Sequence, residues 1–432
     1  MKLRSIEELY SIYTAHPSVV TDTRKLKAGD LYFALKGPNF NGNHFALAAL
    51  EVGAAYAIVD EAIADSDELH GRIIFVEDVL TTLQELAKYH RQQFDIPFIA
   101  ITGSNGKTTT KELVYTVLTS HFKTYTTQGN LNNHIGVPLT LLSIPKDADM
   151  AVIEMGANHQ KEIESYCSYT LPTHGMITNC GKAHLEGFGS EEGVKKGKGE
   201  LYDFLRAHNG TVFIMEDYPY LQSMSQGIEN IVSYGQHSGQ IQGEAMDADG
   251  MLTVKINKGI ALDTIATNLV GIYNLPNVLA AITIGQYFKV PNEKIKVAIE
   301  NYIPTNSRSQ LVQWKNNEVI LDAYNANPSS MKLAVENISK LNKANKVVCL
   351  GGMRELGADT LVEHQMLIEQ LKQTNWSEVL LVGSEFKSCN HPYHYFDTVQ
   401  DAKAWLISKQ FSGYTILIKG SRGIQMEQLI AP

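Results

Sequence analysis

The feature that most constrains this chain is an apolar run that leads directly into a glycine-rich turn. Residues 97–102 read PFIAIT, and GSNGKTT follows at residues 103–109. A continuous apolar run is typical of a strand buried on both faces of a parallel sheet, and a helix is predicted after the turn, over residues 111–120. Glycines let the backbone curve around a phosphate, and the first N–H groups of a helix point at it. The segment therefore predicts a nucleotide-binding α/β domain.

Each residue type in this turn has a chemical use. The predicted phosphate loop comprises Gly103, Ser104, Asn105, Gly106, Lys107, Thr108 and Thr109. A lysine in this place reaches the β- and γ-phosphates of a nucleotide, and the hydroxyl that follows suits Mg²⁺, so we expect these roles for Lys107 and Thr108. The loop is a shortened variant, because Ile101 stands where a first glycine is usual. A plain strand–turn–helix connection is the alternative, and it leaves the Gly-Lys-Thr triplet unexplained.

A carboxylate ends a later apolar strand. Residues 150–153 read MAVI, and Glu154 closes the run. In doubly wound sheets, ligands bind at the carboxyl ends of the strands, and a carboxylate there can hold Mg²⁺ opposite a phosphate loop. Glu154 is therefore a candidate metal ligand. A strand-end glutamate that faces solvent is an equally acceptable interpretation of this segment alone.

The length and the pattern of the chain predict several domains. One hydrophobic core stops growing near about 250–300 residues, and this chain has 432. Apolar runs alternate with helical patterns, which indicates the α/β class. We expect a small α/β domain over residues 1–95, a doubly wound domain over 96–310 and a second Rossmann-like domain over 311–432. Short alternating runs with glycines predict an antiparallel β insertion over residues 234–265.

Composition narrows the class of partner. The net charge is −9, whereas a nucleic-acid partner calls for a basic face. No apolar run reaches the roughly 18 residues of a membrane span, and residues 1–20 lack the apolar core of a signal peptide. The four cysteines are scattered, without a C-x-x-C pair, which fits a reducing compartment. We expect a cytoplasmic protein that binds no nucleic acid, and a monomer, since no coiled-coil pattern is present.

Further motifs accompany the phosphate loop along the chain. They are N-L-N-N at 130–133, G-V-P at 136–138, I-T-N at 177–179, A-H-L at 183–185, F-G-S at 188–190, K-G-K-G-E at 196–200, G-I-Y-N-L-P-N at 271–277, S-R at 307–308 and Asp322. In order and spacing these motifs resemble the Mur ligases, a family of ATP-dependent enzymes that form amide bonds. The resemblance covers nearly the whole chain.

Two motifs resemble the branch of this family that adds the dipeptide D-alanyl-D-alanine. They are D-A-Y-N-A-N-P at 322–328 and K-G-S-R at 419–422. The segments D-T-R at 22–24 and G-D-L-Y-F-A-L-K-G at 29–37 resemble its UDP-binding domain. Three positions depart from the family pattern. Tyr273 stands where many relatives have histidine, Asn43 alters a Gly-His-x-Phe pattern, and Gly352 stands where aspartate is frequent.

The resemblance implies ATP and Mg²⁺ as cofactors, and UDP-N-acetylmuramoyl-tripeptide and D-alanyl-D-alanine as substrates. It assigns the reaction centre to Lys107, Glu154, His184 and Lys198, with a carbamate on Lys198. The implied Mg²⁺ ligands are Thr108, Glu154, His184 and Lys198. Beyond the phosphate loop, the implied ATP contacts are Asn274, Asn277, Arg308 and Asp322. The implied substrate contacts are Thr23 and Arg24 at the UDP end, with Asn133, Asn325, Asn327 and Arg422 elsewhere.

Taken singly, His184 is interpreted as a hydrogen-bonded loop histidine, and the lysines at 195, 196 and 198 as a solvated helix start. The order of the motifs favours the metal-site interpretation of both. The implied reaction passes through an acyl phosphate, and closure of the third domain over ATP would keep water from it. Two alternatives stay open: a related ligase, such as the one that adds the third residue or a folylpolyglutamate synthase, and a non-catalytic protein that binds ATP and a UDP-sugar.

Overall fold

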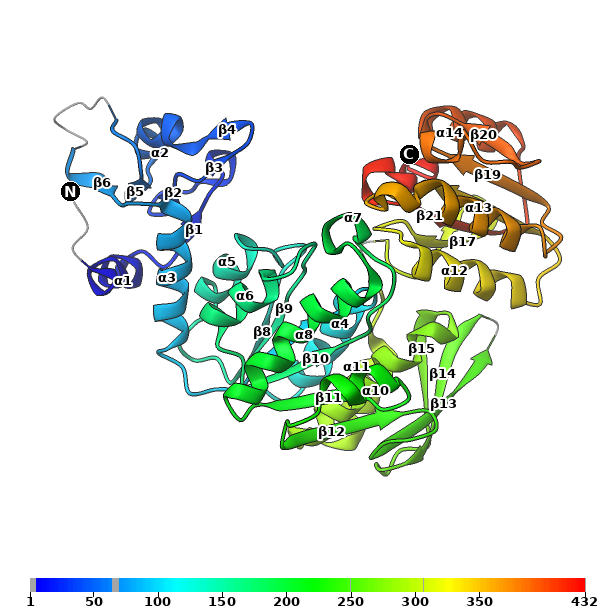
Figure 1. The fold of residues 1–432 in the computed structure, drawn as a ribbon, viewed down its shortest axis with the longest axis horizontal. Helices are drawn as coiled ribbons and strands as arrows, with labels where there is room; N and C mark the ends of the chain where they lie inside the picture. Colours follow the sequence, from blue (N-terminus) through cyan, green and yellow to red (C-terminus); the bar gives the residue numbers. More distant parts are fainter. Residues whose placement is uncertain (1–4, 64–69, 249, 306, 432) are drawn as a thin grey trace. The chain divides into compact units, whose positions relative to one another are not determined.

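The structure is a computed structural model that describes residues 5–63, 70–248, 250–305 and 307–431 (Figure 1). The chain forms two compact units. The first holds the chain up to Ala100 together with Phe122–Gly156 and Glu162–His174, and the second holds Ile101–His121, Ala157–Lys161 and the chain from Gly175 onward. Among the helices in the described ranges, none combines the length and the apolar composition that a bilayer crossing requires.

The N-terminal residues of the first unit form a parallel sheet with the order β1-β2-β5-β6. Its strands are β1 (Val19–Val20), β2 (Leu31–Phe33), β5 (Tyr56–Val59) and β6 (Ile73–Phe75), and β3 (Lys36–Gly37) pairs with β4 (Phe40–Asn41) apart from it. The helices are α1 (Ile6–Ala15), α2 (Ala46–Val52) and α3 (Val79–Arg91). Tyr32 and Val59 share one core with Ala46 and Leu50 of α2, so this helix packs on the parallel sheet.

A nine-stranded sheet follows the order β15-β14-β13-β12-β11-β10-β7-β9-β8. Its members up to β12 are β7 (Phe98–Thr102), β8 (Thr124–Thr126), β9 (Met150–Glu154), β10 (His174–Ile177), β11 (Thr211–Met215) and β12 (Asn230–Gly235). Every residue of β7 is buried, as its continuous apolar run predicts. The pairs β8–β9 and β11–β12 are parallel, which agrees with a doubly wound domain.

The predicted β insertion is present, with different limits. It consists of β13 (Ile241–Ala248), β14 (Met251–Lys258) and β15 (Thr264–Val270), and both of its internal pairings are antiparallel. Tyr234 belongs to β12, and it pairs with Ile241 in parallel. The insertion therefore continues the main sheet instead of forming a separate layer, because β13 takes up the free edge of β12.

The helices that flank this sheet are α4 (Lys107–Thr119), α5 (Gly136–Leu142), α6 (Glu162–Thr170), α7 (Leu185–Phe188), α8 (Glu191–Ala207), α9 (Pro219–Met224), α10 (Leu275–Tyr287) and α11 (Asn292–Asn301). Helix α10 is buried almost all round and packs against α4 and strands β11 to β13. Helix α4 begins at Lys107, earlier than the predicted residue 111, because the Lys-Thr-Thr residues form its first turn.

The C-terminal domain is a six-stranded sheet with the order β16-β17-β21-β18-β19-β20. Its elements are β16 (Gln310–Trp314), β17 (Asn317–Asp322), α12 (Pro328–Lys340), β18 (Lys346–Gly351), α13 (Thr360–Leu371), β19 (Glu378–Val382), β20 (His394–Phe396), α14 (Val399–Ser408) and β21 (Thr415–Lys419). Only the β16–β17 pairing is antiparallel among its described pairings. The α/β class is thereby confirmed. The register brings Asp322 beside Lys419 at the carboxyl ends of β17 and β21.

Candidate nucleotide-binding site

The phosphate loop connects β7 to α4 through two glycines in the left-handed region. Gly103 has φ +142° and Gly106 has φ +79°. A Cβ on Gly103 would lie 2.0 Å from Oγ1 of Thr178, and a Cβ on Gly106 would lie 2.7 Å from Oδ1 of Asn277. Both positions therefore require glycine for space as well as for backbone freedom. The side chains of Thr108 and Thr109 are almost fully buried on the first turn of α4.

The end of β10 holds this loop in place. Asn105 donates its N–H to Oδ1 of Asn179 at 3.0 Å, and its carbonyl accepts from Thr178 Oγ1 at 2.6 Å and from Asn179 Nδ2 at 3.1 Å. The Ser104 hydroxyl donates to the carbonyl of Gly181 at 2.9 Å. Residues 178–181 thus fix the loop, so its N–H groups keep one arrangement. The I-T-N motif has a physical role here that the sequence alone did not show.

The Lys107 ammonium folds over the loop that carries it. Its Nζ donates to the carbonyl of Gly103 at 2.6 Å and to that of Ser104 at 3.2 Å. The positive charge therefore lies against two carbonyl oxygens of the loop, on the side chain of the residue that begins α4. A helix start and an ammonium at one place favour an anion.

Two of the residues assigned to ATP lie beneath the loop. Asn277 accepts from Oγ1 of Thr110 at 3.1 Å and donates to Oδ1 of Asn274 at 2.9 Å, and Asn274 donates to the carbonyl of Val270 at 2.9 Å. Both side chains are buried. Their amides connect the start of α10 to α4, and a contact with the nucleotide stays a prediction for both.

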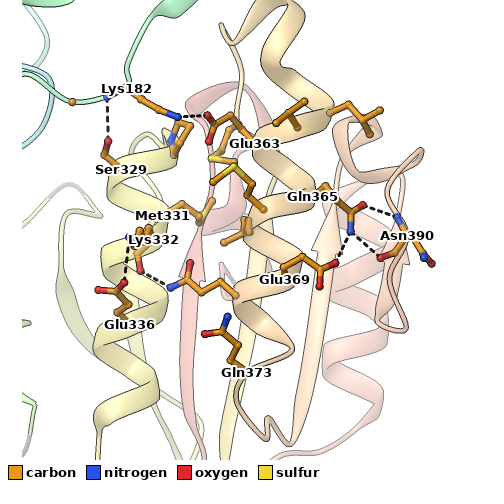
Figure 2. A pocket seen from close by; sticks show the side chains of 18 of the residues that line it. Lys182, Ser329, Met331, Lys332, Glu336, Glu363, Gln365, Glu369, Gln373 and Asn390 are labelled. Atoms are coloured by element: carbon orange, nitrogen blue, oxygen red, sulfur yellow. Dashed lines mark hydrogen bonds and ion pairs between the residues drawn. The ribbon is translucent and has the colours of Figure 1, made fainter. Parts of the chain in front are cut away.

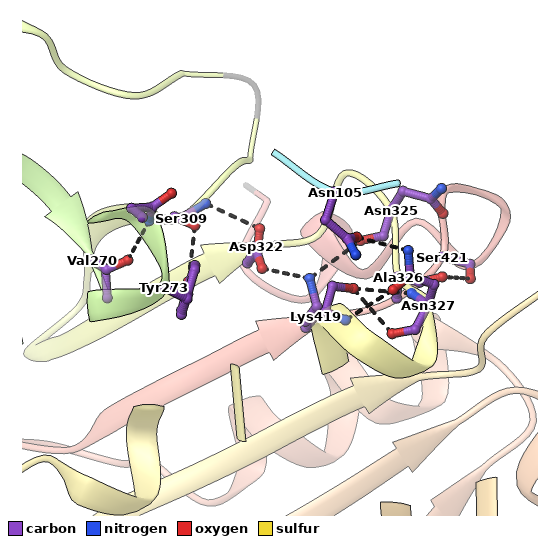
Figure 3. A network of polar contacts seen from close by, with 12 residues as sticks. Asn105, Val270, Tyr273, Ser309, Asp322, Asn325, Ala326, Asn327, Lys419 and Ser421 are labelled. Atoms are coloured by element: carbon purple, nitrogen blue, oxygen red, sulfur yellow. Dashed lines mark hydrogen bonds and ion pairs between the residues drawn. The ribbon is translucent and has the colours of Figure 1, made fainter. Parts of the chain in front are cut away.

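Asp322 is the centre of a second polar group, which Figure 3 shows. Its carboxylate accepts from Nζ of Lys419 at 2.5 Å and from the N–H of Ser309 at 3.2 Å. The Ser309 hydroxyl lies 3.0 Å from the hydroxyl of Tyr273. Burial, and then the Asp322 charge, raise the pKa of Tyr273, so this phenol stays neutral. Lys419 was noted in the sequence only as part of K-G-S-R, and its pairing depends on strands distant in the sequence.

The loop after β17 reaches the phosphate loop. Asn327 caps α12 through Oδ1, which accepts from the N–H of Ser330 at 2.9 Å, and its Nδ2 donates to Oδ1 of Asn105 at 2.8 Å. The carbonyl of Asn325 accepts from Lys419 at 3.4 Å. Asn327, which the sequence analysis assigned to the substrate side, therefore directly contacts the phosphate loop.

Two arginines approach one ring in this loop. The Arg308 guanidinium carbon lies 3.6 Å from the ring centroid of Tyr324, and that of Arg422 lies 5.8 Å from it. Arg422 is exposed and pairs with Glu427 at 2.7 Å. The structure thus brings Arg308, Asp322, Asn325, Asn327 and Arg422 to the carboxyl end of the C-terminal sheet.

His184 directly precedes α7, whereas Lys198 lies within α8. His184 has left-handed φ and ψ, and its Nδ1 makes a short contact with the carboxylate of Glu355. That hydrogen bond is the main cause that lowers the pKa of Glu355. Lys198 is 1 % exposed, donates from Nζ to the carbonyl of Ala157 at 2.9 Å, and lies 5.1 Å from the ring centroid of Phe188. Each of these two side chains therefore has a contact that the sequence did not predict.

The remaining assigned residues belong to the first unit. Glu154 is 1 % exposed, and its Oε1 accepts from Nδ2 of Asn132 at 2.7 Å. Its burial rules out the interpretation of a solvent-facing strand-end glutamate. Oδ1 of Asn133 accepts from the N–H of Gly136 at 2.8 Å and so caps α5. Arg24 is exposed and pairs with Asp22 at 2.8 Å, beside Thr23 in the same turn.

A cavity of about 1130 Å³ lies between α12 and α13 and extends to Gly181 and Lys182 (Figure 2). Nζ of Lys182 pairs with Glu363 at 2.8 Å, and its N–H donates to Oγ of Ser329 at 3.1 Å. Sequence reasoning missed Lys182, since no motif carried it. Across the described ranges, no group of three or more His, Cys, Asp or Glu side chains is placed to hold a metal ion. The assigned Mg²⁺ ligands include a threonine and a lysine, which lie outside these residue types.

Comparison with known proteins gives three sequence-family matches along the chain. Residues 17–91 match the Mur ligase family catalytic domain, residues 101–285 the Mur ligase middle domain, and residues 307–422 the Mur ligase glutamate ligase domain. The UDP-N-acetylmuramoyl-tripeptide–D-alanyl-D-alanine ligase of Bacillus subtilis (strain 168) is 33 % identical over 428 residues, which cover 95 % of this chain and 92 % of that protein.

Solved structures agree with these sequence matches. A crystal structure of MurF from Acinetobacter baumannii has a TM-score of 0.86 and 29 % identity, over 95 % of this chain and 92 % of that one. The MurF ligase of Thermotoga maritima in complex with ADP has a TM-score of 0.85 and 25 % identity, over 95 % of this chain and 96 % of that one. The three-domain α/β architecture expected from the sequence is confirmed by these matches.

Proposed function

Because this chain belongs to the Mur ligase family, we propose that it is the ATP-dependent ligase that joins D-alanyl-D-alanine to UDP-N-acetylmuramoyl-tripeptide in the synthesis of peptidoglycan precursors. One observation carries this proposal. The Bacillus subtilis ligase of that specificity aligns with 95 % of the chain, and the match to the C-terminal family model, residues 307–422, spans the D-A-Y-N-A-N-P and K-G-S-R segments. A sister ligase would share the phosphate loop but have another sequence in the first of these segments.

ATP binding follows from the geometry of the loop. The residues after β10 hold this loop, and the Lys107 ammonium lies against the carbonyl of Gly103. Helix α4 begins at Lys107, and the first N–H groups of a helix favour an anion. A β-phosphate in this place would compete for the ammonium with the carbonyls of Gly103 and Ser104. Arg308 and Asp322 supply a cation and a carboxylate for the phosphate and ribose ends.

The reaction needs an activated carboxylate. The terminal carboxylate oxygen of the tripeptide attacks the γ-phosphorus, the bond from that phosphorus to the bridging oxygen breaks, and ADP leaves. The dipeptide amine then attacks the acyl carbon, the bond from carbon to the phosphate oxygen breaks, and phosphate and one proton leave. Lys107 and the α4 N–H groups stabilise the charge that gathers on the phosphoryl oxygens, and positioning supplies most of the rest.

Mg²⁺ would neutralise phosphate charge when bound. We assign its ligands to Thr108, Glu154, His184 and a carbamylated Lys198. The oxygens of Thr108 and Glu154 suit this ion, and Glu154 is almost fully buried with Asn132 holding one of its oxygens. An unmodified Lys198 ammonium would repel Mg²⁺, so Lys198 fits only as a carbamate, whose anionic oxygens are hard donors.

The finer assignments are also part of the proposal. Thr23 and Arg24 take the UDP end, and Asn133, Asn325, Asn327 and Arg422 contact the other substrate groups. The proposed domains are residues 1–95, 96–310 and 311–432. The proposed oligomeric state is a monomer, and the proposed compartment is the cytoplasm. ATP supply supports that compartment, as do four cysteines without a disulfide. Light scattering would test the monomer.

Phosphate release from ATP tests the function. The purified chain is given UDP-N-acetylmuramoyl-tripeptide with D-alanyl-D-alanine, with single amino acids, or with no amino donor. Release that needs both the tripeptide and the dipeptide is the expected outcome. Release with a single amino acid on a shorter acceptor would assign the chain to a sister ligase, and ATP binding without release for any donor would assign it to a non-catalytic protein.

A further inference from the structure

Arg308 is held by a strained stretch of backbone. The serines on either side of it, Ser307 and Ser309, have φ of +55° and +47°, a region that is unfavourable for residues with a Cβ. The carbonyl of Ser307 accepts from the N–H of Tyr324 at 3.2 Å. Ser309 is held by Asp322 and by Tyr273. Such strain persists only where the surroundings hold it, and it clusters at ligand clamps.

The guanidinium of Arg308 lies on an aromatic ring, and within the described part of the chain it makes no ion pair with a carboxylate. Its carbon is 3.6 Å from the ring centroid of Tyr324, and its Nε is buried without a hydrogen-bond partner among the described residues. A carboxylate partner would occupy the donors of an arginine. A ring face fixes the plane of the cation and leaves its in-plane N–H groups available to another anion.

The position of the ring indicates which anion this is. Tyr324 lies in the loop between Asp322 and Asn327, and Asn327 contacts Asn105 of the phosphate loop at 2.8 Å. The same loop therefore carries the ring that orients Arg308 and the amide that meets the phosphate loop. A cation oriented from this loop is placed for the phosphate groups of the nucleotide.

We propose that Tyr324 is a positioning residue, which holds the Arg308 guanidinium flat so that its N–H groups bind the phosphates of the nucleotide. The inference rests on the proposed function, because it takes ATP as the ligand. Tyr324 acts through Arg308 and need not touch the nucleotide. Loss of the ring would leave the charge of Arg308 in place but release its orientation.

A double-mutant cycle in nucleotide affinity tests this role. Affinities for ADP and for adenosine are measured by calorimetry for the wild type, Tyr324→Leu, Tyr324→Phe, Arg308→Ala and the Tyr324→Leu/Arg308→Ala pair. We expect Tyr324→Leu to weaken ADP binding about 3- to 30-fold, the range for a partly desolvated cation–π contact. Adenosine affinity should not change, and Tyr324→Phe should keep ADP affinity within about 2-fold, because the ring remains.

The cycle separates positioning from packing. In the Arg308→Ala background, Tyr324→Leu should weaken ADP binding no further, since the residue through which it acts is gone. Lys409→Ala is the matched control: it removes another cation–π contact, 4.7 Å from the ring centroid of Trp405, and should leave ADP affinity unchanged. Arg308→Lys gives a second test with Tyr324 intact, and it should weaken ADP binding, because an ammonium cannot lie flat on the ring.

Equal losses for ADP in both backgrounds, an equal loss for adenosine, or an unchanged affinity in Arg308→Lys would each overturn the inference. A wild-type chain that binds no ADP would instead overturn the proposed function. The two failures are therefore distinct, and Arg308→Lys keeps the inference testable if the leucine variant does not fold.

Discussion

Replacing Lys419 with methionine should destabilise the C-terminal domain strongly. Lys419 is 2 % exposed in its side chain, Asp322 is 17 % exposed, and their charged atoms are 2.5 Å apart. Methionine has a similar length but no charge, so the replacement leaves the Asp322 carboxylate largely buried and without its ammonium. Breaking a buried pair from one side costs about 3–5 kcal/mol. We expect about 3 kcal/mol, the lower end, because the carboxylate keeps some contact with water.

Tryptophan fluorescence gives a local reading of this loss. The chain has three tryptophans, and all of them, Trp314, Trp376 and Trp405, lie in the C-terminal domain. Unfolding of that domain in urea can therefore be followed within the intact chain. With a slope of about 2 kcal/mol per molar urea, a loss of about 3 kcal/mol lowers the midpoint by about 1.5 M.

Two companion variants make the reasoning refutable. Lys343→Met removes an exposed pair with Glu318, whose side chains are 35 % and 40 % exposed, and should cost about 0–1 kcal/mol. Adding Asp322→Asn to Lys419→Met removes the stranded charge and should recover most of the loss. If Lys419→Met lowers the midpoint no more than Lys343→Met does, the buried pair is not what stabilises the ends of β17 and β21.

Three further outcomes are expected. Gly103→Ala should abolish ADP binding, measured by calorimetry, because the added Cβ would lie 2.0 Å from Thr178 Oγ1. The control variant Gly413→Ala, at φ +76° with open space around the Cβ, should leave ADP binding intact. Equal ADP binding by the two variants would contradict this prediction. Asn327→Asp should keep the cap of α12, and hence the urea midpoint of the tryptophan signal. It should weaken ADP binding, because it replaces the donor to Asn105 with a negative charge. Unchanged ADP affinity would show that the contact with Asn105 is dispensable. Burial lowers the pKa of His90 below its ordinary value of 6.5. The unfolded chain therefore binds a proton at His90 at a higher pH than the folded chain does, and the free energy of unfolding falls as the pH drops below 6.5. In thermal melts at about pH 7 and about pH 5.5, His90→Gln should show a smaller difference in melting temperature than the wild type; an equal difference would place the effect elsewhere.

The phosphate loop was predictable from sequence because all of its parts are local. A buried strand, two glycines and the first turn of a helix follow one another within residues 97–109, and each leaves a pattern in the sequence. The same holds for β9, whose limits match the apolar run that ends at Glu154. The start of α4 was placed too late, since lysine and threonine in a first turn carry no apolar periodicity.

What sequence could not supply is the pairing of distant residues. The register of β17 against β21 places Lys419 beside Asp322, and no local pattern reports a register between strands nearly a hundred residues apart. Asn327 and Asn105, Lys182 and Glu363, and Arg308 and Tyr324 are also long-range or loop-dependent contacts. The motifs singled out most of these residues, though not Lys182 or Glu363, and only the fold shows which partner each one has.

The fate of the carboxylate oxygens tests the central claim most directly. The tripeptide substrate, with ¹⁸O in both oxygens of its terminal carboxylate, is incubated with ATP, D-alanyl-D-alanine and the purified chain, and the phosphate and the UDP-linked product are analysed by mass spectrometry. We expect one labelled oxygen in each released phosphate and one retained in the new amide of a UDP-pentapeptide, because the carboxylate attacks the γ-phosphorus. Unlabelled phosphate, released by attack of water on ATP, would contradict the ligase account.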